Sequence, residues 1–311
     1  MIVHLKHNDI NKTKWDDCIS HSFNGNAYVK SWYLDLVHED WEALIEDDYQ
    51  RVMPLTLKTK YGITYFYQPF FTQQFGVFSK KILNSDIIDT FIDKIPKHIK
   101  LIDVNFNSFN NIINDKYNTI RNTNYLLDLI SDYPKLKSKY STNTKRNIKK
   151  SLKSNLSFIK NIKPENVINL FKNNKGKDIT SWNDSNYAVI QRIMYTSIHK
   201  GIGFTCGVYT DYNEICAAAF FLVSNNHLIF LFSGANEIAK SNGAMPMLID
   251  TIISENSGTP LILDFEGSNN ANLARFYRGF GAQKTSYTGL KINRLNFFQK
   301  TGISIAKKIL R

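Results

Sequence analysis

The sequence has few of the features that would place a protein outside the ordinary globular class. It has three cysteines in 311 residues and no pair at CxxC spacing, which excludes a disulfide framework and a zinc site built from cysteine pairs. No run of about 18 apolar residues occurs, so no membrane span is expected. The N-terminal segment lacks the apolar core of a signal peptide. We therefore expect a cytoplasmic protein.

Several catalytic signatures are also missing. The chain contains no HExxH, GxSxG or Walker loop, so the zinc-protease, serine-hydrolase and NTP-hydrolysing classes are not indicated. We expect no metal. Cys206 and Cys216 lie in apolar, strand-like segments with no histidine near them in the sequence. Buried thiols are usually inert, so a cysteine nucleophile is a weak alternative.

Positive charge, in contrast, is in excess. The chain has 39 Lys and Arg against 27 Asp and Glu, a net charge of +12. This balance favours an anionic partner such as nucleic acid, a phosphate-bearing cofactor or an anionic membrane face. The alternative is a compositional bias toward lysine without a functional meaning. Apolar residues make up 43% of the chain, enough for a complete core.

The order of elements predicts an α/β protein of two domains. Residues 1–135 alternate short helices with strands of period two. Residues 136–295 read as helix, helix, three strands, helix, strand, helix and a last strand or loop. Residues 296–311 form a basic amphipathic pattern, which would either touch anionic lipid at the inner face of the membrane or pack on the body of the protein.

The most aromatic stretch of the first domain covers residues 65–78. Gln68, Gln73 and Gln74 interrupt it. Amide side chains among aromatic rings favour the wall of a ligand-binding cleft, with the amides fixing the ligand's orientation. The alternative is an aromatic core with glutamines at a strand end.

The densest positive charge lies at the junction, in residues 135–160. Arg146, Lys149, Lys150 and Lys153 are spaced to share one face of a helix, and Ile148 and Leu152 are predicted on the other. Such a face is either solvated or a docking surface for the phosphates of an RNA or a substrate. The pattern leaves both interpretations open.

The second half of the chain is organised around residues 227–282. A strand over 227–232 leads through a loop of small and polar residues to a helix that starts near Ala244. Backbone N–H groups at such a junction favour an anion or a carbonyl oxygen. A second strand over 261–265 ends beside Asp264 and Glu266, where parallel strands usually deliver catalytic groups.

These segments resemble the GNAT acyltransferases. Lys240 to Met245 stands where that fold places the Q/R-x-x-G-x-G/A loop, which holds the pyrophosphate of coenzyme A. Gly243 matches its central glycine, whereas Lys240 and Met245 depart from the pattern. Asn270, Tyr277 and Gly281 match the spacing of a late motif. The resemblance implies that Tyr277 is a general acid toward a leaving thiolate.

A closer resemblance, over nearly the whole chain, is to FemAB-like proteins. Their basic helix reads roughly NTRRNIKK and is NTKRNIKK at 143–150 here; their FKKGFG segment is FYRGFG at 276–281. Tyr277 thus replaces a lysine of the aminoacyl-transferring members. The resemblance implies two tandem GNAT-like domains, each a mixed twisted sheet flanked by helices. The first would be degenerate, and the active cleft would lie between them.

Acyl transfer to an amine requires removal of a proton, stabilisation of an oxyanion and protonation of the leaving group. We assign the base to Glu266 and the acid to Tyr277. The alternatives are a charge complementing a helix dipole for Glu266 and core packing for Tyr277, and Asp264 is interpreted as structural. The expected cofactor-binding residues are Ser233, Gly234, Lys240, Asn242, Gly243, Ala244 and Met245. The expected substrate-binding residues are Gln68, Gln73, Gln74, Arg146, Lys149 and Arg278.

The sequence thus favours an N-acyltransferase that uses an acyl thioester, on coenzyme A or a carrier protein, and a small or lipid-like amine acceptor. A second hypothesis replaces the donor by aminoacyl-tRNA, with residues 145–153 contacting the RNA or the carrier protein. A third is a binding protein whose acyl-transfer site has decayed.

Overall fold

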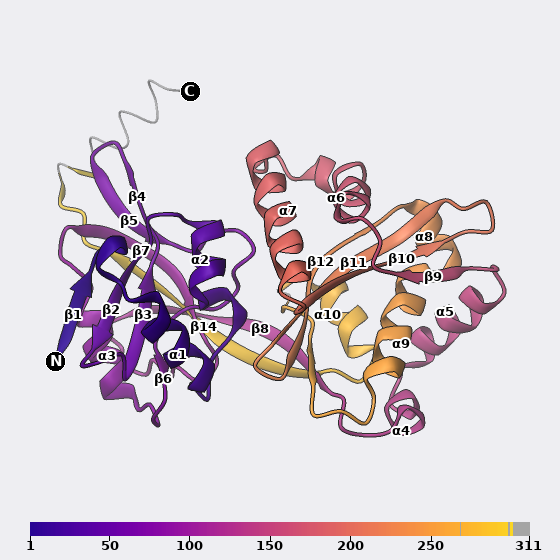
Figure 1. Cartoon of the computed structure of the whole chain (residues 1–311), viewed down its shortest axis with the longest axis horizontal. Helices are drawn as coiled ribbons and strands as arrows, with labels where there is room; N and C mark the ends of the chain where they lie inside the picture. The colour runs from indigo at the N-terminus through magenta and orange to yellow at the C-terminus, as the bar shows by residue number, and fades with distance from the viewer. Residues whose placement is uncertain (268, 298, 301–311) are drawn as a thin grey trace. The chain divides into compact units, whose positions relative to one another are not determined.

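The structure is a computed structural model that describes residues 1–267, 269–297 and 299–300. Most of the expected C-terminal helix, 296–311, lies outside the described residues. The chain forms two compact units (Figure 1). Unit 1 contains residues 1–122 and the described residues from 286 on, and unit 2 contains residues 123–285. This division differs from the expected boundary near residue 135, and the last strand pairs in unit 1 rather than in the second domain.

Unit 1 contains two sets of strands flanked by α-helices. The first sheet has the order β1-β2-β3-β6, all antiparallel: β1 (Ile2–Leu5), β2 (Glu42–Glu46), β3 (Arg51–Leu55) and β6 (Phe78–Ser79). The second set has the order β4-β5-β7-β14, in which β5 and β7 are parallel: β4 (Leu57–Lys60), β5 (Ile63–Tyr67), β7 (Ile99–Phe106) and β14 (Gln283–Asn293). The helices are α1 (Lys12–His21), α2 (Ser31–Val37) and α3 (Ser85–Lys94).

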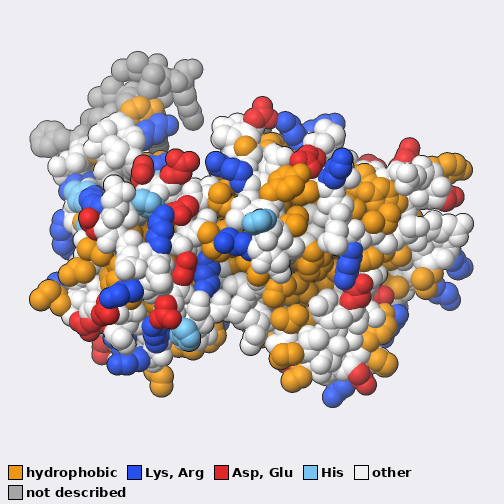
Figure 2. Space-filling model, viewed as in Figure 1, with side chains coloured by type: hydrophobic (Ala, Val, Ile, Leu, Met, Phe, Trp, Pro, Cys, Tyr) orange, Lys and Arg blue, Asp and Glu red, His pale blue; other side chains and the backbone are white. Residues whose placement is uncertain are grey.

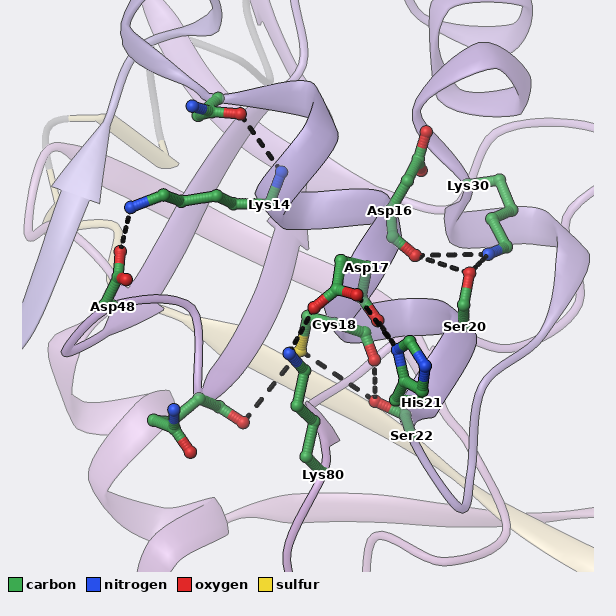
Figure 3. A network of polar contacts seen from close by, with 12 residues as sticks. Lys14, Asp16, Asp17, Cys18, Ser20, His21, Ser22, Lys30, Asp48 and Lys80 are labelled. Atoms are coloured by element: carbon green, nitrogen blue, oxygen red, sulfur yellow. Dashed lines mark hydrogen bonds and ion pairs between the residues drawn. The ribbon is translucent and has the colours of Figure 1, made fainter.

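Helix α1 is fixed by a cap, a buried face and a polar network. The Asn11 side chain accepts a hydrogen bond from the Lys14 N–H, a typical N-cap. The Trp15 indole donates to the Val29 carbonyl at 2.7 Å. On the outer side, Lys80 pairs with Asp17 and lowers the pKa of that carboxyl, as Figure 3 shows. These contacts join segments distant in sequence and have a structural role.

Unit 2 is built on a sheet with the order β8-β13-β12-β11-β10-β9. Its strands are β8 (Asn118–Asp128, which begins in unit 1), β9 (Ser157–Lys160), β10 (Gly203–Tyr209), β11 (Ile215–Ser224), β12 (His227–Ala235) and β13 (Ile262–Asp264). Only β12 and β13 are parallel. The helices are α4 (Tyr133–Ser138), α5 (Thr142–Leu152), α6 (Pro164–Lys172), α7 (Asp184–His199), α8 (Glu237–Asn242), α9 (Ala244–Asn256) and α10 (Ala271–Arg278).

The helices of unit 2 cover both faces of this sheet (Figure 1). Helices α5, α9 and α10 pack on one face, where alternate strand residues such as Val208, Leu228 and Phe230 join a single apolar cluster with them. Helices α6 and α7 cover the other face. Successive side chains of a strand point to opposite faces of the sheet, so helices on both faces bury both sets of side chains.

None of the described helices is long and apolar enough to cross a membrane.

Two local predictions in unit 2 are wrong. The strand predicted over 227–232 continues to Ala235, and the loop predicted after it is helix α8. Leu152, predicted on the inner face of its helix with Ile148, is 73% exposed, whereas Ile148 is buried. The helix ends there, because Lys153 is its C-cap, so the apolar spacing no longer implies burial.

Candidate active site

The parallel strands of unit 2 separate at one point, which we call the fork. Strands β12 and β13 pair over three residues each, and the last pair is Ile229 with Asp264. Beyond this pair β13 ends, whereas β12 continues to Ala235 with β11 as its partner. Strand β13 therefore does not extend along the second half of β12.

A β-bulge lies in β12 at the fork. Phe232 pairs with Phe220 and Phe230 with Phe221, which leaves Leu231 as an extra residue. A bulge re-aims the backbone groups next to it and occurs frequently near active sites. The bulge interrupts the regular pairing of β11 and β12 two residues beyond the last β12–β13 pair.

The chain leaves β13 in a conformation that polar contacts hold in place. Glu266 has a φ of +53°, a left-handed conformation that is unfavourable for a residue with a side chain. Its N–H donates to Asp264 Oδ1 at 2.8 Å, and the Asn124 amide donates to the same oxygen at 3.0 Å. The Asn124 side-chain oxygen Oδ1 in turn accepts a hydrogen bond from the Gly267 N–H. Asn124 and Asp264 thus fix the direction of the Glu266 side chain.

The Glu266 carboxyl points into the protein. Its Oε1 is inaccessible to solvent and has no hydrogen-bond partner among the described residues. Burial raises the pKa of this carboxyl well above its usual value. Glu266 does not cap the following helix; the Asn270 side chain does, by accepting from Asn272 and Leu273. Glu266 as a whole is half-buried, but a carboxyl with one buried oxygen that lacks a partner is a candidate for proton transfer.

Tyr277 lies close to Glu266. Burial raises the pKa of its phenol, and the charge of Glu266 contributes to the increase. The ring is 7% exposed and stacks on Phe265 at a centroid distance of 4.7 Å. The two residues therefore interact electrostatically, and Tyr277 is also part of the core; their catalytic roles stay a prediction. With its pKa raised, the phenol keeps its proton at neutral pH and can donate a hydrogen bond.

A surface pocket of about 680 Å³ lies between α5, α9 and α10, and neither Glu266 nor Tyr277 is among its lining residues. Helix α10 supplies Arg275 and Arg278, which flank Tyr277 in the sequence, and no acidic residue lines the pocket. Its lining residues are Ser141, Asn143, Thr144, Asn147, Pro246, Asn272, Arg275, Phe276, Arg278 and Gly279. Two guanidinium groups among hydroxyl and amide groups suit a phosphate-bearing ligand.

The predicted pyrophosphate loop has a different geometry from the one expected. Asn242, Gly243 and Ala244 are buried, and they join α8 to α9 directly. A Cβ on Gly243 would lie 2.4 Å from the Asn147 carbonyl oxygen, and the Ala244 N–H is taken by the Asn242 side chain. Helix α5 therefore covers the start of α9, and the expectation of an open anion site there is wrong.

The other predicted cofactor-binding residues have structural partners. Gly234 packs under α6, because a Cβ on it would lie 2.5 Å from the Phe171 nitrogen. Lys240 pairs with Glu237 at 2.6 Å on the surface. Met245 packs against the apolar cluster, and Ser233 is half-buried beyond the bulge. Their assignment to a cofactor stays a prediction.

The predicted substrate-binding glutamines of unit 1 bond within that unit. Gln68 donates to Thr72 and accepts from the Asn105 N–H at 3.0 Å. Gln74 donates to Gln73 and accepts from the Ser108 N–H. These bonds order the segment after β5, which matches the structural alternative for the three amides.

The remaining predicted residues lie in unit 2. Arg278 lines the pocket. Arg146 and Lys149 are exposed on α5 and are not among the pocket's lining residues. Cys206 and Cys216 are buried, and burial raises the pKa of both thiols, which leaves them poor nucleophiles. The described residues contain no cluster of side chains suited to a metal ion.

Three residues of the site were not predicted from the sequence: Asn124, Thr144 and Arg275. Asp264, interpreted as structural, holds the Asn124 amide and the Glu266 N–H. Asn124 is more than a hundred positions from Glu266, and no periodic pattern marks such a pair. Arg275 could have been found, because it lies three residues before Arg278 and therefore on the same helix face.

No family model matches the chain, and no curated protein matches it in sequence. Solved structures do match. FemX has a TM-score of 0.64 at 11% identity and covers 91% of this chain and 96% of its own. A protein of unknown function from Bacteroides thetaiotaomicron has a TM-score of 0.60 at 10% identity, over 94% and 100%. L-PGS from Bacillus licheniformis has a TM-score of 0.53 at 9% identity, over 96% and 97%.

These likenesses concern the fold. The chain has a FemX-like fold, and the predicted α/β fold class is confirmed. At identities of 9–11% the likeness does not extend to substrates. Function has to be argued from the fork, the Glu266–Tyr277 pair and the pocket.

Proposed function

We propose that the protein is an acyltransferase that moves an acyl group to an amine at the fork of unit 2. The observation that carries this proposal is the inward-pointing Glu266 carboxyl, which has no described partner for Oε1 and lies beside Tyr277. Two polar groups buried together at the end of parallel strands are costly to the fold. Such a cost is typical of functional sites.

The reaction uses these groups in a defined order. The amine nitrogen attacks the acyl carbon and gives its proton to the Glu266 carboxylate, directly or through a water. The N–H groups near Leu231 stabilise the oxyanion while the C–N bond forms. The bond from carbon to the leaving group then breaks, and the Tyr277 hydroxyl gives its proton to that group.

The donor is proposed to be an acyl thioester on coenzyme A or a carrier protein. Both carry phosphate, which suits Arg275 and Arg278 in the pocket. Tyr277 lies between these arginines in the sequence of α10.

Aminoacyl-tRNA is a second candidate donor. The observation in its favour is the closed junction at Gly243, since the start of α9 offers no open cradle for a pyrophosphate. The 3′ end of an RNA needs no such cradle. Its phosphates would contact the arginines, and a base could stack on the half-buried Phe276.

A transfer assay with three donor classes tests the proposal. The purified protein is incubated with a panel of amines and with acyl-CoA, acylated carrier protein or aminoacyl-tRNA, and products are identified by mass. We expect product with one donor class and its loss in Tyr277→Phe and Glu266→Gln. Turnover at the wild-type level in both variants would show that the assigned roles are wrong.

Binding without transfer has a separate readout. A donor that binds the folded state raises the melting temperature by mass action. A shift with one donor and no product from any amine would indicate a binding protein with a decayed site. No shift and no product with all three donors would overturn the proposal.

A further inference from the structure

Helix α5 combines positive charge with an exposed apolar side chain. Every charged residue from Tyr133 to Lys153 is a lysine or an arginine. On α5 these are Lys145, Arg146, Lys149 and Lys150, with Lys153 at the C-cap, and all five are exposed. Blue side chains mark this edge of unit 2 in Figure 2, where α5 lies in Figure 1.

The buried residues of α5 show which side of the helix faces outward. Thr144, Ile148 and Ser151 are buried. The outward face consists of two neighbouring rows at the i, i+3, i+4 spacing: residues 145, 149 and 152, and residues 146, 150 and 153. Leu152, which is 73% exposed, therefore lies among the lysines and not opposite them.

The cationic side chains of α5 form few interactions with the rest of the protein. Lys145 donates to the Ser138 carbonyl at 2.9 Å and Arg146 to the Asn143 side chain at 2.8 Å. Lys149, Lys150 and Lys153 form no ion pair with any residue that the structure describes. By contrast, Lys172 on α6 pairs with Asp184 at 2.7 Å. The positive charge on the outward face of α5 is therefore not balanced by ion pairs with described residues.

We propose that the outward face of α5 docks the protein on an anionic lipid surface. Lysines on a helix face attract the phosphates of acidic headgroups, and a leucine among them can enter the boundary between headgroups and acyl chains. An RNA would satisfy the lysines equally well, but its backbone offers nothing to Leu152. The leucine is the reason to favour lipid over nucleic acid.

Vesicle sedimentation tests this proposal with the full chain. We expect binding to vesicles of equal parts phosphatidylglycerol and phosphatidylcholine, and none to pure phosphatidylcholine. The binding should weaken strongly when salt is raised to about 0.5 M. Neutralising Lys149, Lys150 and Lys153 together by Lys→Gln changes should reduce affinity on the order of a hundredfold. Leu152→Ser should reduce it about tenfold.

Matched variants separate the face of α5 from the net charge of the protein. Lys97, Lys177 and Lys284 are exposed lysines elsewhere on the chain, and their triple Lys→Gln change removes the same charge. Ile82→Ser removes an exposed apolar side chain in unit 1. Both control variants should bind like the wild type. Equal loss in the two lysine triples would overturn the proposal.

An RNA competition completes the test. A single-stranded RNA matched in phosphate concentration should displace the protein poorly from the acidic vesicles. Full displacement by the RNA, together with vesicle binding that Leu152→Ser leaves unchanged, would show that the face recognises nucleic acid and would overturn the proposal. Absence of binding to the acidic vesicles at low salt would overturn it as well.

Discussion

Gly243 lies directly against the backbone of Asn147, since a Cβ on Gly243 would be 2.4 Å from the Asn147 carbonyl oxygen. Its φ is +78°, a conformation that glycine adopts at little cost. This contact joins the α8–α9 junction to the middle of α5. The same helix lines the pocket through Asn143, Thr144 and Asn147, so the shape of the pocket depends on this close approach.

Gly243→Ala should therefore destabilise the protein by about 2–4 kcal/mol, because strain in the left-handed region adds to a clash with backbone. Gly258→Ala is the matched control. Its φ is +75°, and a Cβ there would meet nothing within 4 Å, so only the conformational term of about 1 kcal/mol is expected. Urea unfolding of both variants measures the difference. Equal losses would mean that the contact with Asn147 is unimportant for stability.

The fold was largely predictable because it rests on periodicity and on element order. Strands such as Ile215–Ser224 and helices such as Asp184–His199 carry apolar patterns that local sequence makes visible. The α8 helix was missed since its six residues, Glu237–Asn242, are too few for a periodic signal. Its cap comes from Asn236, which equally indicates a turn.

The site was predictable only in part. Glu266 and Tyr277 could be singled out as candidates because a strand end and a spaced motif mark them, and their roles stay a prediction. The partners that position Glu266 were not, since Asn124 is distant in sequence and its role follows from how β8 pairs with β13. The burial of the Asn242–Gly243 junction by α5 likewise depends on tertiary packing, which the local sequence does not show. An Asn-Gly pair before a helix looks the same in an open loop and under a packed helix.

Glu266→Gln should remove the acid limb of the rate profile. In the wild type the base must be ionised, so the transfer rate should rise with pH through the raised pKa of Glu266. Glutamine cannot accept the proton, so kcat should fall by about 10²–10⁴-fold and lose this limb. The profile of kcat against pH is the measurement, with the exposed surface change Glu255→Gln as control. An unchanged acid limb in Glu266→Gln would assign the base to another group.

The same change should stabilise the fold in a pH-dependent manner. The folded protein keeps the Glu266 proton to a higher pH than the unfolded chain does, because burial raises the pKa. Wild-type stability therefore falls as pH rises from the unfolded pKa, about 4.3, to the raised folded pKa, and then levels. Glutamine has no such loss. Its melting temperature should exceed the wild type by about 2–4 °C at neutral pH and by less near pH 4. A difference that is constant with pH would contradict a buried, protonated carboxyl.

Replacing the pocket's arginines with neutral residues should weaken binding of the donor more than it slows the chemical step. Arg275 and Arg278 line the pocket but do not belong to the fork. Arg275→Gln and Arg278→Gln should each raise the KM for the donor about tenfold, because each removes a charge-assisted hydrogen bond to phosphate. The value of kcat should stay within about threefold, since Glu266 and Tyr277 are untouched. Arg192→Gln changes an exposed arginine on α7 and should alter neither constant. A loss of kcat with unchanged KM in the pocket variants would place the arginines at the reacting atoms and the donor's phosphate elsewhere.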